Sequence, residues 1–218
     1  MTKPEILSRL LSPGIIAILR ADSSEHLLAA AEALLRGGVT AMEVTMTTPG
    51  ALETIGEVNR RFGHQILMGV GSVLDPETAR LAILAGAQFV VTPVVRPEVI
   101  RVCNRYSKPI ACGALTPTEA LLAHDSGADF VKIFPADQFG PTYIRNILAP
   151  LPMLQVVPTG GVTPENAGDF LAAGSVALGV GSSLVSKSVL EKGDWAELTR
   201  RAQRFVHAVE TARAPVRS

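Results

Sequence analysis

Two charged side chains stand inside strand-like segments that are otherwise apolar. Lys132 lies in the segment FVKIFPA (130–136), and Glu43 lies in the segment AMEVTM (41–46). Side chains alternate between the two faces of a strand, so each charged group points away from its apolar neighbours, which suit a layer facing helices. Both groups are therefore predicted to face the interior of the fold.

A lysine in such a position can act as a nucleophile. Desolvation disfavours the ammonium, lowers the lysine pKa and leaves a neutral amine that can attack a carbonyl carbon. A carboxylate nearby, such as Glu43, can serve as general acid and base. The pattern alone leaves a second interpretation open, in which Glu43 is the counter-ion of Lys132 in a structural ion pair.

A third charged group, Arg20, ends the segment IIAILR (15–20), on the same face as Ile16 and Ile18. A guanidinium group binds a carboxylate through two parallel hydrogen bonds, so Arg20 is a candidate for holding an acidic substrate. An ion pair with Glu43, or with another carboxylate near the strand end, is the alternative.

Glycine-rich turns end two of the later strand-like segments. Thr159-Gly160-Gly161 ends one, and Gly179-Val180-Gly181-Ser182 ends the next. Glycine lets backbone amides approach an anion closely, and barrel enzymes often bind phosphate at two such adjacent turns. One Gly-Gly pair is usually just a turn, but two neighbouring turns favour a phosphate site. No Walker motif or G-x-G-x-x-G fingerprint opens the chain, so a nucleotide is less favoured.

Eight short apolar segments alternate with helical patterns along the whole chain. The ends of successive segments are 20 to 26 residues apart, which leaves no gap for a second domain. Apolar strands that are each followed by a helix pair in parallel, and eight such units favour a closed (β/α)8 TIM barrel. We therefore expect one α/β domain over 1–218, with an extra helix over EILSRLL (5–11) capping the barrel's bottom. The expected strands cover 15–20, 41–46, 65–73, 89–93, 109–115, 130–136, 155–161 and 175–183.

Capping residues followed by proline mark the expected helix starts. Their side chains can bond an unpaired amide, and proline loses nothing in the first helical turn. These pairs are Thr48-Pro49, Asp75-Pro76, Thr116-Pro117 and Thr163-Pro164. The last helix is expected from about Trp195 to Thr211, followed by a frayed tail over 213–218.

The composition excludes some classes of partner. The 20 Lys and Arg residues balance 20 Asp and Glu residues, so no charge excess would attract nucleic acid or an anionic membrane. Apolar residues make up 47% of the chain and charged residues 18%, which allows a large core and favours self-association. No signal-peptide pattern and no apolar run of transmembrane length is found, so a cytoplasmic location is expected.

The cysteines and histidines carry little signal of their own. Cys103 and Cys112 form no C-x-x-C pair and have no histidine cluster beside them, so free thiols are expected rather than a disulfide or zinc site. Cys112, inside a strand, is predicted to pack in the core. The histidines fall on helices or connections and are predicted to be surface groups: His26, His64, His124 and His207.

Taken in order, these segments resemble the 2-keto-3-deoxy-6-phosphogluconate (KDPG) aldolase family, also described as 4-hydroxy-2-oxoglutarate aldolases. The matching segments run from IIAILRAD through GGVTAMEVTMTTPGALE, GVGSVLDPETA, AGAQFVVTP, LTPTEA, GADFVKIFPA and VVPTGGVTPEN to GVGSSL. No single segment is specific, but the ordered set is, and it covers essentially the whole chain.

The resemblance implies a role for each matching position. Lys132 is implied to be the Schiff-base lysine and Glu43 the acid and base, while Thr159 is implied to bind the substrate carboxylate. The implied phosphate-binding residues are Gly160, Gly161, Gly181 and Ser182. The implied pocket residues are Thr45, Ser72, Pro93 and Phe134, of which the last packs against the imine.

Position 47 departs from the pattern of many family members. Those members carry arginine four residues after the catalytic glutamate, in an EVTLR-like motif, to hold the pyruvyl carboxylate, and this chain has Thr47 there. A second branch has arginine at the end of the first strand, as this chain has in Ile18-Leu19-Arg20. Arg20 is therefore inferred to bind the carboxylate, and the exchange bears on substrate preference more than on the chemistry.

The resemblance implies a class I aldolase that needs no metal and no other cofactor. Its implied substrate is a 2-keto-3-deoxy-6-phospho sugar acid, with the phosphogluconate type favoured, cleaved to pyruvate and glyceraldehyde 3-phosphate. Cleavage of 4-hydroxy-2-oxoglutarate to pyruvate and glyoxylate, a homotrimer and a role in Entner–Doudoroff-type breakdown are implied as well. The alternatives are a phosphogalactonate-type aldolase, a sugar-phosphate isomerase or epimerase without a covalent step, and a non-catalytic phospho-ligand barrel.

Overall fold

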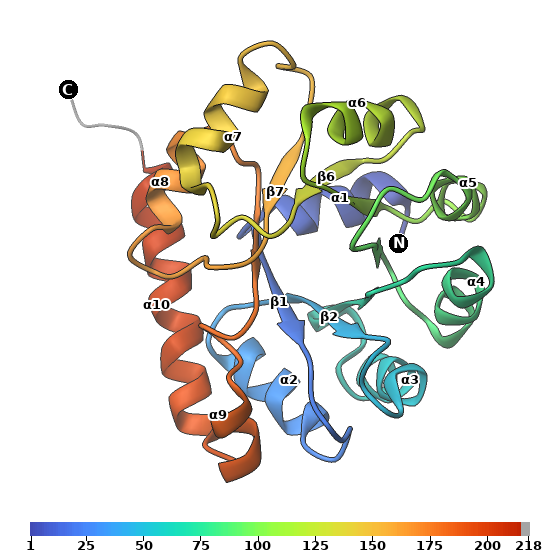
Figure 1. Cartoon of the computed structure of the whole chain (residues 1–218). Coiled ribbons are helices and arrows are strands. Elements are labelled where there is room, and N and C mark those ends of the chain that lie inside the picture. Colours follow the sequence, from blue (N-terminus) through green and yellow to red (C-terminus); the bar gives the residue numbers. More distant parts are fainter. Residues whose placement is uncertain (215–218) are drawn as a thin grey trace.

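Parallel strands form the centre of this computed structural model, which describes residues 1–214 (Figure 1). The strands are β1 (Ile15–Leu19), β2 (Ala41–Thr45), β3 (Leu67–Gly71), β4 (Val90–Val91), β5 (Ile110–Ala114), β6 (Phe130–Ile133), β7 (Val156–Pro158) and β8 (Leu178–Val180). They form an 8-stranded sheet in the order β7-β6-β5-β4-β3-β2-β1-β8. A bridge between Thr159 and Gly179 links β7 to β8, so the ring is nearly closed and the predicted (β/α)8 barrel is confirmed.

The strands are shorter than the sequence predicts. The segment expected over 175–183 forms a strand only over Leu178–Val180, and Arg20 follows β1 instead of ending it. The reason is that amides beyond the ladder bond within turns, as when Leu184 and Val185 both donate to the Gly181 carbonyl. The residues that leave the ladder early therefore lie on loops at the carboxyl end of the barrel, where barrel enzymes build their sites.

Helices surround the strands in the described part of the chain (Figure 1). They are α1 (Lys3–Leu11), α2 (Leu27–Arg36), α3 (Ala51–Phe62), a short 3₁₀ turn (Gly63–Gln65), α4 (Pro76–Ala85), α5 (Pro97–Arg105), α6 (Pro117–Asp125), α7 (Gly140–Leu148), α8 (Ala167–Ala172), α9 (Lys187–Lys192) and α10 (Trp195–Arg213). No helix within residues 1–214 is both long enough and apolar enough to cross a membrane.

Two of the four predicted helix starts are confirmed. The Asp75 carboxylate accepts a 2.6 Å hydrogen bond from the Thr78 amide at the start of α4. Thr116 and Glu119 form a reciprocal capping box at the start of α6. In both cases the capping residue and the proline after it act within one helical turn, so a local sequence pattern is sufficient.

The other two predicted helix starts are wrong. The hydroxyl of Thr48 accepts a hydrogen bond from the Ala21 amide instead, and α3 begins only after Gly50, whose φ of 72° is left-handed. Helix α8 begins after Asn166, because the side chain of Asn166 accepts from the Thr163 amide and holds residues 163–166 in a turn.

The predicted N-terminal helix, α1, closes the amino-terminal end of the barrel (Figure 1). Its Ile6 and Leu10 are buried against interior-facing side chains of the strands. These include Ile16, Ala41, Leu67, Phe89, Val91, Ala111, Phe130 and Val157. This apolar layer fills the lower interior, so the polar interior groups are confined to the carboxyl end.

The last helix, α10, extends two residues beyond its predicted end. Arg213 is its final residue, and its guanidinium donates to the carbonyls of Leu11, Pro13 and Val176. The expectation of a tail frayed from residue 213 is therefore wrong at its first position, and residues 215–218 lie outside the described part of the chain. The predicted core position of Cys112 is confirmed, since its side chain is buried and the thiol is free.

Candidate active site

Lys132 and Glu43 face the barrel interior, as strand alternation predicts. Lys132 comes from β6 and is 8% exposed, and Glu43 comes from β2 and is 2% exposed. Both side chains line one small cavity inside the barrel, together with apolar residues such as Ile18 and Val157. An amine and a carboxyl group thus share one small space inside the barrel, and both are largely removed from solvent.

The two groups do not form a direct ion pair. Within residues 1–214, no carboxylate oxygen lies within 4.0 Å of the Lys132 Nζ atom. The Oε2 atom of Glu43 is buried, and no hydrogen-bond partner for it exists in the described chain. A buried polar atom without a partner is costly, so its retention here points to a role in chemistry more than in stability.

Burial shifts the pKa of both groups toward their neutral forms. Desolvation raises the pKa of Glu43, while the charges of Lys132 and Arg20 oppose this rise. Desolvation likewise lowers the pKa of Lys132; Glu43 opposes the change and Arg20 reinforces it. A lysine whose pKa is lowered in this way offers a nucleophilic amine at lower pH than an exposed lysine does.

An aromatic ring completes the surroundings of the amine. The Lys132 Nζ atom lies 5.1 Å from the centre of the Phe134 ring. A cation near the face of an aromatic ring is stabilised electrostatically, and this would hold for a protonated imine at the same position. Phe134 also lines the larger cavity described next, so its ring is close to both the amine and that cavity.

A larger cavity of about 490 Å³ opens at the carboxyl ends of the strands. Ile18 and Thr159 line both this cavity and the small interior one, so the two meet at these side chains. The other lining residues are Arg20, Ala21, Asp22, Ser23, His26, Phe134, Gly160, Gly161, Val162, Gly181, Ser182, Ser183, Val185, Lys187, Leu190 and Glu191. Such a volume suits a small organic ligand.

The two glycine-rich turns supply unpaired backbone amides to this cavity. Gly160 and Gly161 have φ of 95° and 68°, a left-handed conformation that glycine adopts without strain. Within residues 1–214, the amides of Gly160, Gly161, Ser182 and Ser183 donate to no protein acceptor. An added Cβ at Gly181 would meet nothing within 4 Å, so its surface also faces open space. Free backbone amides at the wall of a cavity can bind anions.

Side chains hold the two turns against each other. Ser183, after β8, donates a 2.6 Å hydrogen bond to the carbonyl of Val162, after β7. The amide group of Asn166 donates to the Gly161 carbonyl at 2.9 Å. The free amides are therefore pre-oriented, which reduces the entropy lost when an anion binds.

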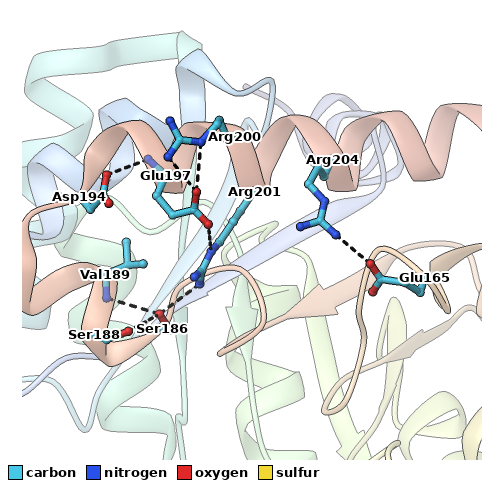
Figure 2. A network of polar contacts seen from close by, with 9 residues as sticks. All are labelled: Glu165, Ser186, Ser188, Val189, Asp194, Glu197, Arg200, Arg201 and Arg204. Carbon is cyan, nitrogen blue, oxygen red and sulfur yellow. Dashed lines mark hydrogen bonds and ion pairs between the residues drawn. The ribbon is translucent and has the colours of Figure 1, made fainter.

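Helix α10 braces both turns from outside. Figure 2 shows Arg201 donating to the Ser186 hydroxyl at the start of α9, at 3.1 Å, while Glu197 holds the same guanidinium at 2.9 Å. Arg204, farther along the same helix, pairs with Glu165 in the loop that follows β7, at 2.8 Å. The contact of Arg201 is half-buried, and that of Arg204 is solvent-exposed and contributes little by itself.

Arg20 reaches the cavity wall from the loop after β1. Its guanidinium has no carboxylate within 4.0 Å in residues 1–214, so neither ion pair left open by the sequence is formed. Thr47, at the position where many family members have arginine, is exposed and bonds the Thr45 hydroxyl at 2.9 Å. Of these two positions, Arg20 is the one that presents a cation to the cavity.

Three of the predicted pocket residues lie at the same end of the barrel but outside the cavity wall. Thr45 is buried and bonds Thr47 and Thr48, Ser72 follows β3 with a left-handed φ of 58°, and Pro93 follows β4. Their contact with a substrate stays a prediction, whereas Phe134 does line the cavity.

Sequence reasoning missed the outer half of the cavity. His26, predicted to be a surface group, is half-buried at the start of α2 and lines the wall, with its ring 5.7 Å from that of Trp195. Lys187 of α9 and Asp22 of the loop after β1 also line the cavity and form an ion pair at 2.5 Å. The usable signal was spacing, because His26 follows Arg20 by six residues and cannot lie far from the strand end.

Comparison with known proteins agrees with this geometry. The family model described as "Aldolase: KDPG and KHG aldolase" matches residues 6–201. A 2-dehydro-3-deoxy-6-phosphogalactonate aldolase of Escherichia coli (strain K12) is 38% identical over 78% of this chain and 83% of its own length. A 2-dehydro-3-deoxy-phosphogluconate aldolase of Pseudomonas aeruginosa is 35% identical over 85% of this chain and 84% of its own length.

A solved structure adds a chemical detail. It is the KDPG aldolase of Legionella pneumophila, with pyruvate captured as a covalent carbinolamine intermediate. It is 26% identical to this chain, with a TM-score of 0.81 over 87% of this chain and 92% of that one. Fold, site and relatives thus define a TIM-barrel aldehyde-lyase. Within that class, the chain belongs to the KDPG and KHG aldolase family.

Proposed function

We propose that this chain is a class I aldolase that cleaves a 2-keto-3-deoxy-6-phospho sugar acid to pyruvate and glyceraldehyde 3-phosphate through a Schiff base on Lys132. The observation that carries the proposal is the state of the Lys132 amine. It is buried, has no carboxylate within 4.0 Å in the described chain, and has a pKa lowered by desolvation. The carbinolamine trapped in the Legionella pneumophila relative is the chemistry that such an amine performs.

In the proposed cycle, neutral Nζ of Lys132 attacks the C2 ketone to give a carbinolamine, which takes up a proton and loses water to give a protonated imine. Glu43, directly or through a water molecule, removes the proton of the C4 hydroxyl. The C3–C4 bond breaks, its electron pair flows into the imine to form an enamine, and the aldehyde leaves. Glu43 returns a proton to C3, and water hydrolyses the resulting imine to free pyruvate and the amine.

The pKa shifts suit these roles. A raised pKa makes Glu43 a stronger base than an exposed carboxylate, which suits a group that takes a proton and later returns it. The nearby Phe134 ring favours the cationic imine over the neutral amine once it has formed. Arg20 is proposed to bind the substrate carboxylate, aided by the Thr159 hydroxyl.

The free amides of the two glycine turns are proposed to bind the substrate phosphate. Gly160, Gly161, Gly181 and Ser182 line the same cavity as Arg20. A substrate bound in this way has its carboxylate and phosphate held at separate places, with its ketone directed toward the small cavity that holds Lys132.

The stereochemistry at C4 is left to assay. We favour the phosphogluconate-type substrate, and the phosphogalactonate type is the second candidate because the 38% identical Escherichia coli relative bears that name. Cleavage of 4-hydroxy-2-oxoglutarate to pyruvate and glyoxylate is proposed as a side activity. Initial rates of pyruvate release from the three substrates, compared as kcat/KM, decide among them.

The covalent step is tested by trapping. Incubation with pyruvate and sodium borohydride should give a reduced adduct, located on Lys132 by peptide mass spectrometry, and Lys132→Ala should abolish both adduct and turnover. Lys108 is a matched control, because burial also lowers its pKa but it lies outside the site. Lys108→Ala should keep adduct and turnover. A wild-type protein without an adduct would instead indicate a proton-shuttling isomerase or epimerase, or a phospho-ligand sensor.

We also propose self-association as a homotrimer. Large apolar side chains are exposed on α4, on the loops that lead into α4 and α5, and directly after α5, where contact with another copy would cover them. They are Leu74, Leu81, Leu84, Val94 and Tyr106. Light scattering coupled to size-exclusion chromatography should give three times the 23.0 kDa chain mass.

A further inference from the structure

Glycines occupy two interior-facing positions of β3, the strand beside Glu43. Along β3, Leu67 belongs to the interior layer, while Met68 and Val70 belong to the outer core against the helices. Alternation therefore places Gly69 and Gly71 on the interior face with Leu67. Glycine weakens a strand, so two of them at alternate positions call for a reason in space or in backbone conformation.

Backbone conformation does not require glycine at position 71. Among the described residues, the glycines with positive φ do not include Gly71, although the next residue, Ser72, has φ of 58°. The amide and carbonyl of Gly71 belong to the strand ladder, and its carbonyl accepts from the Met46 amide at 2.9 Å. Any residue type could adopt this backbone.

Space does require glycine there. An added Cβ at Gly71 would lie 2.6 Å from Oε1, 2.8 Å from Cδ and 3.1 Å from Oε2 of Glu43. An added Cβ at Gly69 would lie 2.5 Å from the Phe89 ring. The carboxyl group of Glu43 therefore fills the volume that a side chain at position 71 would take.

The strand register shows in which direction the Glu43 side chain extends toward the space beside Gly71. The Cα atom of Glu43 is paired with Gly69, yet its carboxyl group lies against Gly71, two residues farther toward the carboxyl end. The Phe89 ring fills the space beside Gly69, so the Glu43 carboxyl group occupies the space that Gly71 leaves free, nearer the carboxyl end of the barrel. No hydrogen bond within the described chain anchors Glu43 Oε2, so the shape of the cavity, more than any bonding partner, sets where this oxygen lies.

From these contacts we infer that Gly71 is a positioning residue for the aldolase reaction: its missing side chain holds the Glu43 carboxyl group within reach of the carbon and oxygen atoms from which protons are moved. This inference rests on the proposed role of Glu43. A methyl group at position 71 displaces the carboxyl group and leaves the Lys132 amine, on the far strand β6, in place.

The direct test is Gly71→Ala. A displacement of about 1 Å in a catalytic group costs on the order of 100-fold in rate. We expect kcat for cleavage, and the rate at which the pyruvate methyl protons exchange with D2O, to fall together by about 10- to 100-fold. KM should change by less than about threefold. The borohydride adduct at saturating pyruvate should form to the same final extent, because it reports Lys132. Wild-type exchange in Gly71→Ala would overturn the inference.

A second background separates positioning from general damage. Glu43→Asp shortens the side chain by one methylene and removes the clash, so adding Gly71→Ala to Glu43→Asp should lower kcat by less than about threefold. Equal fold-losses in the two backgrounds would overturn the inference. If Gly71→Ala alone does not fold, the double variant should fold, and its failure to do so would also overturn it.

Two controls keep this test distinct from that of the proposed function. Gly56→Ala on α3 places its methyl group 3.7 Å from the Ala85 carbonyl oxygen, an ordinary van der Waals contact, and should leave kcat unchanged. Glu43→Gln, which keeps the size and loses the acid, should abolish exchange. If Glu43→Gln retains proton exchange, the role proposed for Glu43 is wrong. If Glu43→Gln loses exchange while Gly71→Ala exchanges at the wild-type rate, only the positioning role of Gly71 is wrong.

Discussion

The clearest consequence of a buried reactive amine is that its removal should stabilise the fold. Lys132 is 8% exposed and lacks a carboxylate within 4.0 Å in the described chain. Methionine has a similar length and no charge to desolvate. Lys132→Met should therefore unfold at higher denaturant concentration than the wild type while losing all turnover, which is the trade between stability and activity expected at a catalytic site.

The sign and size of the effect follow from the lowered pKa. The folded protein holds fewer protons than the unfolded chain between the folded pKa of Lys132 and its ordinary pKa of 10.5, so wild-type stability rises with pH in that window. At pH values below this window, the free energy of unfolding is lower by about 1.4 kcal/mol for each tenfold change in the acidity of the folded lysine. Replacing buried charged groups with apolar ones of similar volume typically gains about 1–4 kcal/mol, which is the gain expected at pH 7.

Urea denaturation at several pH values measures this gain. The difference between Lys132→Met and wild type should shrink as pH rises through the window. Lys108→Met serves as the control, because its ammonium donates to the Gln88 side chain at 3.1 Å and its removal gives up that bond. If Lys132→Met is less stable than wild type at pH 7, the amine forms a stabilising pair in the folded protein, and the argument for an unpaired, desolvated amine fails.

Three further predictions concern the larger cavity. Arg20→Ala should raise KM for the keto acid by about 10- to 100-fold, the value of one charge-assisted contact, with little change in kcat; a wild-type KM would remove its carboxylate role. Gly161→Ala, whose added Cβ would lie 2.4 Å from Asp137 Cβ, should raise KM for phosphorylated substrates and spare 4-hydroxy-2-oxoglutarate, and equal losses on both would argue against a phosphate site. Substrate binding should change the fluorescence of Trp195, the one tryptophan of the chain, because its ring lies 5.7 Å from that of cavity-lining His26. His26→Ala should abolish that signal, and an unchanged signal would place its source elsewhere.

The fold could be predicted because its rules are local. Eight apolar segments at near-regular spacing each bury one face, and the caps at Asp75 and Thr116 act within a single turn. The orientations of Lys132 and Glu43 follow from strand alternation in the same way. Helix boundaries were less predictable, because the Thr48 hydroxyl accepts from the Ala21 amide in the loop after the neighbouring strand β1 and does not cap the helix that follows it.

The outer wall of the cavity could not be read from the residues alone. His26 and Lys187 are ordinary helix-terminal side chains in sequence, and their place at the mouth depends on where α2 and α9 begin. Those starting points are set by tertiary contacts, such as the bond from Arg201 to Ser186 shown in Figure 2. The periodicity of a sequence reflects which faces of an element are buried, and it does not report contacts between residues far apart in the chain.

The limits of sequence reasoning are clearest at positions where a side chain is missing. Charged residues can be recognised in a sequence as candidates for catalysis. The space that such side chains occupy here is left free by glycines, which the sequence does not mark as functional. Gly71 leaves space for the Glu43 carboxyl group, and an added Cβ at Gly179 would lie 2.2 Å from the Thr159 hydroxyl oxygen. Neither glycine has a positive φ, so turn chemistry would not explain either of them. A glycine inside a parallel barrel strand, facing inward and without a backbone reason, therefore predicts that a neighbouring side chain occupies its space: an apolar ring at Gly69, and side chains of the site at Gly71 and Gly179.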